Sequence, residues 1–224
     1  MRRKLQKLFH FEGIPWPASV LYNALSRTYI FQHYYDLIAA DITNSYQEGA
    51  VLDIGTGPGW LLLKLFKYAP GLRLTGLDVS LSMVAVARGN IIQAGLADTV
   101  TITLGSVDSL PFGDSTFDLV VSSGSIHHWK HPIEGMNEIY RVLRPGGTAL
   151  IYDLVRDTPG YLLKETAREF GTLRMVFLWI HGFEEPFYRM KELDEIVSET
   201  IFKKGNVRFV GVMGCLMTTK GDSL

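Results

Sequence analysis

The sequence contains a single cysteine, Cys215, among its 224 residues. One thiol excludes an internal disulfide, a zinc site built from several cysteines and a cysteine-held iron–sulfur cluster. Cys215 lies within the apolar run VMGCLM at positions 212–217. We therefore expect this thiol to pack in the core rather than to act as a nucleophile.

An excess of one charge and long apolar runs are also lacking. Twenty-two Lys and Arg face 23 Asp and Glu, for a net charge of −1, which argues against a broad nucleic-acid surface. No run reaches the ~18 consecutive apolar residues of a membrane span. The basic start MRRK is followed by no continuous apolar segment, so it does not resemble a signal peptide. We expect a cytoplasmic protein with no membrane span and no nucleic-acid partner.

A glycine-rich turn between two apolar runs is the strongest positive feature. The run VLD at 51–53 leads into glycines at 55, 57 and 59, and the helix-like run LLLKLF follows. Glycine lets a backbone approach a ligand closely, because it lacks Cβ and tolerates positive φ. A second apolar run ends in Asp78, whose carboxylate suits the two hydroxyls of a ribose. The pattern predicts a nucleoside-containing ligand.

The spacing of this turn narrows the choice of nucleoside. It reads G-x-G-x-G rather than the dinucleotide fingerprint G-x-G-x-x-G, and no G-K-[ST] follows, which excludes a P-loop. Asp53 stands two residues before Gly55 and would repel a pyrophosphate. It suits an ammonium group instead. S-adenosylmethionine has an ammonium group, a ribose and an adenine, and it has no phosphate.

Four blocks in order now carry a family resemblance: VLDIGTGPG, LTGLDVS, GSVDSLPFGDSTFDLVVSSGSIHHW and EIYRVLRPGG. From about residue 34 to 151 the chain resembles the class I S-adenosylmethionine-dependent methyltransferases, especially the branch of ubiquinone and menaquinone C-methyltransferases. The flanks match only loosely. The resemblance implies methyl transfer to a small-molecule substrate, with S-adenosyl-L-homocysteine as product.

The periodicity predicts an α/β fold. Strand-like runs at 50–54, 72–78, 99–104, 117–122 and 147–153 alternate with helical patterns, which favours a parallel sheet. Residues 206–219 read as late strands. With the resemblance, we expect a Rossmann-like, doubly wound, mostly parallel seven-stranded sheet with a C-terminal antiparallel hairpin and N-terminal lid helices. The expected single domain, 1–224, divides into a helical lid (1–45), a cofactor-binding core (46–154), a helical insert (155–205) and final strands (206–224).

Two flanking segments leave their roles open. The pattern around 29–42 is helical and carries aromatic residues, which suits either a lid or a helix packed on the sheet edge. Helices are expected over about 160–183 and 188–201. Within the first, the segment 174–183 includes five consecutive apolar residues, which predict a buried helix, a substrate wall or a dimer face. A monomer and a homodimer are both consistent with the sequence.

The resemblance implies roles for the residues around the turn. Asp53 would bind the ammonium group, Asp78 the ribose, and Val79 the adenine. Ser106 stands where the family commonly has an aspartate for the adenine amino group, so recognition should depend more on the backbone of Val107. The alternative for both acids is helix capping. The full set of expected cofactor-binding residues is Asp53, Gly55, Thr56, Gly57, Gly59, Asp78, Val79, Ser80, Met83, Ser106, Val107 and Ser123.

A histidine pair follows the fourth predicted strand, in SSGSIHHW. Parallel strands bind ligands at their carboxyl ends, so His127 and His128 are candidate general bases or substrate contacts. Structural hydrogen bonding is the alternative. With His131 the run also suggests a metal site, but adjacent side chains are expected to point apart, so we predict no metal.

Two other functions remain open at this point. One is a module that binds S-adenosylmethionine without transferring its methyl group. The other is a methyltransferase acting on RNA or protein, with a local basic patch from Arg2, Arg3 and Lys4 with Lys203 and Lys204. Methylation of DNA bases is disfavoured, because SSGS replaces the [DN]-P-P-[YF] motif of such enzymes.

Overall fold

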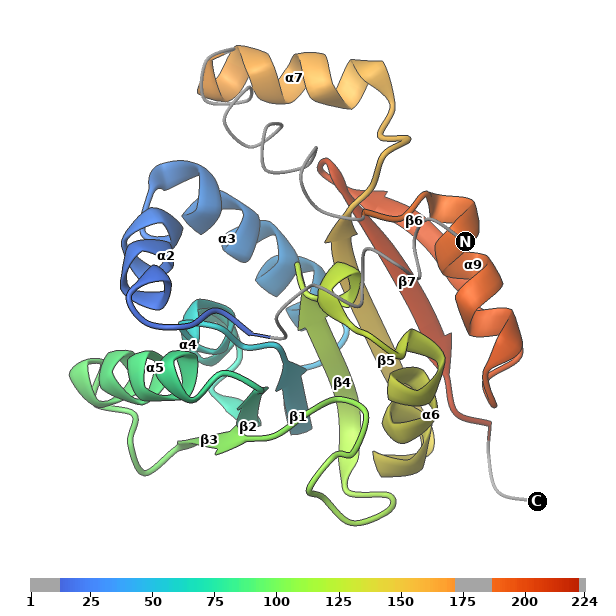
Figure 1. Cartoon of the computed structure of the whole chain (residues 1–224), viewed down its shortest axis with the longest axis horizontal. Helices are drawn as coiled ribbons and strands as arrows, with labels where there is room; N and C mark the ends of the chain where they lie inside the picture. Colours follow the sequence, from blue (N-terminus) through green and yellow to red (C-terminus); the bar gives the residue numbers. More distant parts are fainter. Residues whose placement is uncertain (1–12, 172–186, 222–224) are drawn as a thin grey trace.

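The computed structural model describes residues 13–171 and 187–221, and it contains one mixed sheet (Figure 1). The strand order is β3-β2-β1-β4-β5-β7-β6, in which β1 to β5 pair in parallel while β7 is antiparallel to β5 and β6. This confirms the predicted seven-stranded fold with its C-terminal hairpin. The strands are β1 (Glu48–Ile54), β2 (Gly71–Asp78), β3 (Val100–Leu104), β4 (Phe117–Ser123), β5 (Leu143–Leu154), β6 (Asn206–Val210) and β7 (Met213–Thr219).

Helices cover both faces of the sheet (Figure 1). Core residues of α3, α4 and α5 pack on one face, and those of α6 and α9 pack on the other. The helices are α2 (Ala18–Ser26), α3 (Tyr29–Thr43), α4 (Trp60–Tyr68), α5 (Leu81–Gln93), α6 (Pro132–Val142), α7 (Gly160–Phe170) and α9 (Met190–Glu199), with one 3₁₀ turn, η1 (Ile126–His128).

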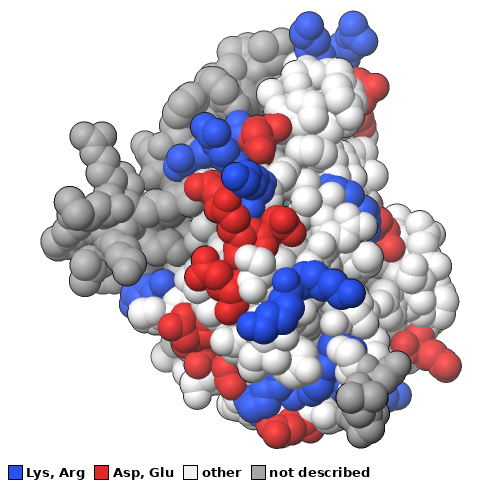
Figure 2. Space-filling view, turned by 90° about the vertical axis from the view of Figure 1, so that its right-hand side faces the viewer, with Lys and Arg blue, Asp and Glu red and all other residues white. Residues whose placement is uncertain are grey.

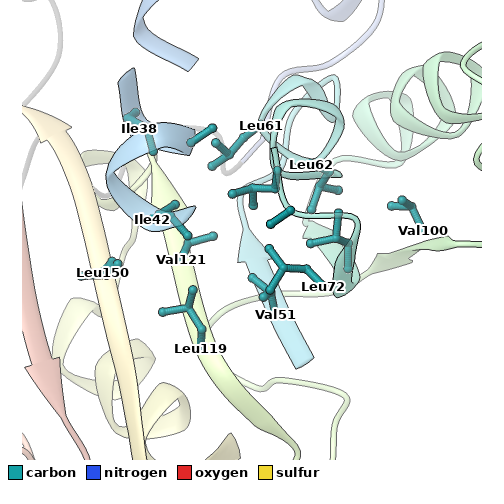
Figure 3. Packing of buried hydrophobic residues seen from close by; sticks show 14 of the residues in the cluster. Ile38, Ile42, Val51, Leu61, Leu62, Leu72, Val100, Leu119, Val121 and Leu150 are labelled. Carbon is teal, nitrogen blue, oxygen red and sulfur yellow. The ribbon is translucent and has the colours of Figure 1, made fainter. Parts of the chain in front are cut away.

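Alternation along the strands builds the two core layers. In β4, Leu119 and Val121 belong to the first layer while Val120 belongs to the second, because successive side chains point to opposite faces. Figure 3 shows the first layer, in which Ile38 and Ile42 of α3 meet the sheet. Cys215 is fully buried there, as predicted, and burial raises the pKa of its thiol to about 12.

Several boundaries differ from those expected. β5 begins at Leu143, four residues before the strand-like run expected at 147–153. α7 ends at Phe170, where Gly171 at φ 85° follows it. The remaining part of the helix expected to 183, including the apolar segment 174–183, lies outside the described residues, as do Arg2, Arg3 and Lys4. Helix α2 lies within the helical segment expected at 1–45, but its own bounds were not predicted, because prolines 15 and 17 precede it and it is only nine residues long.

The topology brings the carboxyl ends of β1, β2 and β4 to one edge. The chain leaves β1 in one direction toward β2 and β3, and it later returns to the other side of β1 with β4. Such a reversal of strand order opens a crevice beside the strand ends, where α/β sheets bind ligands. Within the described ranges, no helix is long and apolar enough to cross a membrane.

Candidate active site

A cavity of about 240 Å³ lies at the carboxyl ends of the strands, in the crevice where the strand order reverses. Most of the predicted site residues line it, from strand ends that are far apart in the sequence. These residues are Asp53, Gly55, Thr56, Gly57, Asp78, Val79, Met83, Ser106, Val107, Ser123, His127 and His128. The topology therefore assembles the candidate cofactor residues and the histidine pair around one space.

Two predicted residues do not line this cavity. Gly59 adopts φ 81° directly before α4, where its backbone starts the helix. Ser80 caps α5, because its hydroxyl accepts a 3.3 Å hydrogen bond from the Met83 N–H. The same hydroxyl donates to the Ile14 carbonyl at 2.6 Å. In the structure, Gly59 and Ser80 shape the ends of helices.

Asp53 is buried at the end of β1, with 2% of its surface exposed. The Thr56 hydroxyl donates a 2.7 Å hydrogen bond to its carboxylate. Burial raises the pKa of Asp53 to about 7, and the charge of Asp78 adds to this rise, while the bond from Thr56 opposes it. A carboxylate in this position gains most from a cationic ligand, which agrees with an ammonium group.

Asp78, the last residue of β2, binds the glycine turn through its side chain. Its carboxylate accepts hydrogen bonds from the Gly57 N–H and the Ser80 N–H, both at 2.9 Å. Burial raises the pKa of Asp78, and these backbone bonds lower it. Ser80, rather than Asp78, therefore caps the helix that follows. The Asp78 carboxylate instead fixes the glycine turn beside the cavity. Two buried acids in one cavity favour a ligand with positive charge.

The glycines of the turn adopt backbone conformations that disfavour any residue with a side chain. Gly55 and Gly57 adopt φ 71° and 50°. A Cβ at Gly55 would lie 2.5 Å from the Ser125 Oγ, so a side chain there would overlap the Ser125 side chain. This glycine cradle, with the buried acid beside it, fits a bulky nucleoside that carries an ammonium group.

Gly55→Ala is expected to destabilise the fold by about 2–4 kcal/mol, since it combines left-handed strain with a steric overlap. Gly89→Ala is the matched control. Gly89 lies within α5, and nothing lies within 4 Å of a Cβ built there. The control should gain roughly 0.5–1 kcal/mol. Urea unfolding measures both variants. Equal stabilities would show that the turn tolerates a side chain.

Ser106, the departure from the family pattern, lines the cavity beside Val107. Its hydroxyl accepts a 3.3 Å hydrogen bond from the Asp108 N–H. The hydroxyl can still donate one bond and accept another. Ser106 can therefore form a neutral hydrogen bond with a polar group of the ligand, where an aspartate would form a charged one.

His127 has a partner that sequence reasoning missed. Its Nδ1 lies 2.8 Å from one carboxylate oxygen of Asp153 and 3.0 Å from the other. The His127 backbone N–H also donates to this carboxylate, at 3.1 Å. Asp153 lies near the end of β5, and both side chains are almost fully buried, at 4% and 2% exposure. The sequence signal that could have revealed this partner is an acidic residue within the apolar run ALIYDLV.

The bond to Asp153 sets the state of the imidazole. A carboxylate accepts from Nδ1–H, so the lone pair of the neutral ring is left on Nε2. Nε2 is buried and has no hydrogen-bond partner among the described residues. An acceptor without a partner in the wall of a ligand cavity is an arrangement that folding alone disfavours.

The expectation that His127 and His128 point apart is wrong. They lie in the 3₁₀ turn η1, and their ring centroids are 4.0 Å apart with a 44° tilt. The prediction assumed regular helix or strand geometry, which does not hold in this short turn. Within residues 13–171 and 187–221, no three His, Cys, Asp or Glu residues form a group that could hold a metal ion.

The N-terminal helices complete the cavity wall with two tyrosines. Tyr22 of α2 and Tyr35 of α3 line the cavity and share a side-chain hydrogen bond. Burial raises the pKa of both phenols. Ile38 and Ile42 of α3 belong to the core, so α3 both supports the sheet and faces the cavity. The lid interpretation of residues 1–45 stays a prediction.

Comparison with known proteins agrees with this geometry. Residues 52–151 match a family model described as a methyltransferase domain. The chain is 31% identical over 187 residues to a demethylmenaquinone methyltransferase of Chlorobaculum parvum, covering 77% of this chain and 75% of that protein. It is 32% identical over 154 residues to a ubiquinone/menaquinone biosynthesis C-methyltransferase of Geobacter sulfurreducens, covering 68% of this chain and 59% of that protein.

Solved structures show the same fold. A candidate S-adenosyl-L-methionine-dependent methyltransferase of Methanococcus maripaludis superposes with a TM-score of 0.73 at 24% identity, covering 96% of this chain and 97% of that one. The chain spans only about half the length of several curated relatives, such as 53% of a rice 2-methyl-6-phytyl-1,4-hydroquinone methyltransferase. The matched domain, the sequence relatives and the cavity lead to one conclusion: the chain belongs to the S-adenosylmethionine-dependent methyltransferase family.

Proposed function

We propose that this protein transfers a methyl group from S-adenosylmethionine to a carbon atom of a small phenolic acceptor of the hydroquinone type. The observation that carries the proposal is the buried His127 Nε2, which has no partner among the described residues and belongs to a residue lining the cofactor cavity. The names of the relatives from Chlorobaculum and Geobacter support a quinone-type acceptor.

The residues divide the cavity between cofactor and acceptor. Asp53 would hold the ammonium group, the turn from Gly55 to Gly57 would cover the methionine and ribose, and Asp78 would meet the ribose hydroxyls. When bound, S-adenosylmethionine supplies an electrophilic methyl group and a neutral thioether as leaving group. The role of the protein is then to align the acceptor, exclude water and move a proton.

His127 moves that proton. Nε2 takes the hydroxyl proton of the acceptor, and the resulting phenolate directs electron density to the neighbouring ring carbon. That carbon would receive the methyl group that the cofactor supplies, with the C–S electron pair leaving on the thioether sulfur. Loss of the ring proton to solvent would restore the aromatic ring, and His127 would return its proton to the phenolate oxygen. Asp153 orients the imidazole and stabilises its charged form, so it is a positioning residue.

The net charge of −1 and the charges on one side of the molecule disfavour a nucleic-acid substrate. Figure 2 shows the side of the molecule that carries α9, where basic and acidic side chains are mixed over the surface. A phosphate-binding surface concentrates Lys and Arg instead. A binding module without transfer activity is the remaining alternative, and a ligand-binding test followed by an activity test separates it.

Thermal shift measurements test the cofactor class first. A ligand at 100 times its dissociation constant adds about 2.7 kcal/mol, so S-adenosylmethionine and S-adenosylhomocysteine should both raise the melting temperature, and NAD should not. Methyl transfer is then measured with a demethylated naphthohydroquinone that carries a short side chain. A shift with NAD alone would reject the cofactor. Binding without transfer to any phenolic acceptor would favour the binding module.

A further inference from the structure

The amino-acid end of S-adenosylmethionine carries two opposite charges, and Asp53 accounts for only one of them. Asp53 would pair with the ammonium group. The carboxylate of the cofactor is attached to the same carbon atom, so it would lie next to this buried acid. An anion in such a place needs hydrogen-bond donors or a cation. Among the described residues that line the cavity, none is a Lys or an Arg. The carboxylate therefore depends on neutral donors.

The donors of the glycine turn are already in use. Each of its backbone N–H groups donates within the protein: those of Gly55 and Thr56 to the Leu77 carbonyl, that of Gly57 to Asp78, and that of Gly59 to the Thr56 carbonyl. These bonds are 2.8 to 3.0 Å long. Pro58 has no N–H. The Thr56 hydroxyl donates to Asp53. Donors for the carboxylate must come from another wall of the cavity.

Two phenols of the N-terminal helices form such a wall. Tyr22 comes from α2 and Tyr35 from α3, and both line the cavity. A Cβ built on Gly57 would lie 3.9 Å from the Cε1 of Tyr22, so the Tyr22 ring lies against the glycine turn. Tyr35 is close enough to Asp53 for the charges of the two groups to interact. The two tyrosines thus lie beside the acid that would hold the ammonium group.

The hydrogen bond between the two tyrosines has a direction. Burial raises the pKa of both phenols, whereas their mutual bond lowers the pKa of Tyr22 and raises the pKa of Tyr35. A hydrogen bond stabilises the ionised form of its acceptor and the neutral form of its donor, so Tyr35 donates and Tyr22 accepts. A phenol that accepts one bond keeps its own proton for another. The Tyr22 O–H is therefore available to an acceptor in the cavity.

We propose that Tyr22 and Tyr35 form the binding site for the carboxylate of S-adenosylmethionine. The Tyr22 hydroxyl donates to a carboxylate oxygen, and Tyr35 holds that hydroxyl in place as a positioning residue. Neutral donors suit this position, because a Lys or Arg here would pair with Asp53 and compete with the ammonium group. The inference rests on the proposed function in one respect, the placement of the ammonium group on Asp53.

Calorimetric titration without an acceptor tests the site. The two ligands are S-adenosylmethionine and its decarboxylated form, which keeps the nucleoside, the sulfonium and the ammonium group and lacks only the carboxylate. Tyr22→Phe should weaken binding of S-adenosylmethionine by about ten- to a hundredfold, the usual effect of losing a hydrogen bond to a charged group. It should leave binding of the decarboxylated ligand nearly unchanged.

Tyr34→Phe is the matched control. Tyr34 precedes Tyr35 on α3, its hydroxyl bonds to Thr166, and it is not among the residues lining the cavity. This variant should bind both ligands as the wild type does. Melting temperatures show whether each variant folds.

Tyr35→Phe tests the second member of the pair. It should weaken binding of S-adenosylmethionine by a smaller factor than Tyr22→Phe, because the Tyr22 hydroxyl remains but is no longer held. The double variant should bind no more weakly than Tyr22→Phe alone, since the two residues act through one bond. If Tyr22→Phe does not fold, the comparison of the two ligands in Tyr35→Phe decides in its place.

Two outcomes would overturn the carboxylate site. One is a folded Tyr22→Phe variant that binds S-adenosylmethionine as tightly as the wild type. The other is an equal loss of affinity for both ligands, which would mean that the tyrosine shapes the cavity without contacting the carboxylate.

Failure of the proposed function gives a different pattern. If Asp53 does not hold the ammonium group, Asp53→Asn should leave the affinity for both ligands unchanged, because both carry that group. Binding that follows the predicted pattern, without methyl transfer to any phenolic acceptor, would reject the proposed function and leave the carboxylate site in place. Methyl transfer with no difference between Tyr22→Phe and the wild type in cofactor binding would do the reverse.

Discussion

Turnover by the His127→Ala variant is expected to fall by about 10²–10⁴-fold, the usual contribution of a positioned general base. The dissociation constant of S-adenosylmethionine should stay nearly unchanged, because the imidazole is assigned to the acceptor and not to the cofactor. Single-turnover kinetics with a hydroquinone acceptor measure the first quantity, and calorimetric titration with the cofactor measures the second.

His131→Ala is the matched control. His131 is an exposed neighbour of the same turn and is not among the residues lining the cavity, so its loss should leave turnover intact. Wild-type turnover in His127→Ala, with intact cofactor binding, would dismiss the base and leave His127 a structural residue.

Asp153→Asn extends the test to the positioning residue. An amide can donate to Nδ1, which moves the ring proton to Nε2 and removes the lone pair that the mechanism uses. We expect kcat to fall about as far as in His127→Ala while KM for the cofactor changes little. A variant that loses stability but keeps its kcat would assign Asp153 a purely structural role.

Asp53→Asn is expected to weaken S-adenosylmethionine binding by about 10²–10³-fold, because it removes the charge that would pair with the ammonium group in a buried site. Titration calorimetry at pH 8 measures this loss directly. Thr56→Val is the informative comparison, since it removes the hydroxyl that donates to Asp53 and keeps the charge. An unchanged affinity in Asp53→Asn would remove Asp53 from the cofactor site.

The raised pKa of Asp53 gives this site a pH dependence with a definite sign. Its pKa is about 7 because of burial, and only the carboxylate form pairs with an ammonium group. Affinity should therefore fall as pH falls, by about tenfold between pH 8 and pH 6. In Asp53→Asn the affinity should be flat over this range. A wild-type affinity that does not vary with pH would contradict the pairing.

Stability without the cofactor should respond in the opposite direction. A folded pKa of about 7, above the ordinary value of 3.8, means that the folded state keeps its proton longer, so the stability falls as pH rises from about 4 to about 7 and then levels off. At pH 8 the Asp53→Asn variant should be more stable than the wild type, by on the order of 2 kcal/mol. The buried Asp53 carboxylate thus strengthens ligand binding and lowers the stability of the ligand-free protein.

The sequence predicted which acids lie at the strand ends, but it did not predict which side chains from different strand ends contact one another. Asp53 and Asp78 were found because each ends an apolar run beside a glycine or a helix start. Asp153 ends a similar run, but its role depends on the adjacency of β4 and β5, which no local pattern contains. The closeness of the two histidine rings likewise arises from the irregular turn η1.

Helix α2 shows a second limit of pattern reading. Its apolar residues recur at helical spacing, and this pattern normally predicts the inward face. The structure turns that face outward, because Trp60 and Asn90 bind the polar face through hydrogen bonds. Both partners lie far along the chain. Only the tertiary contacts reveal which side of the helix is buried.

The most direct test of this account is transfer of a labelled methyl group. The wild-type protein is incubated with S-adenosylmethionine labelled in its methyl group and with a demethylated short-chain naphthohydroquinone, and the product is analysed by mass spectrometry. We predict that the label becomes attached to a ring carbon, at a rate that His127→Ala lowers at least about a hundredfold. A labelled product formed equally fast by both proteins, or no labelled product although the cofactor binds, would contradict the account.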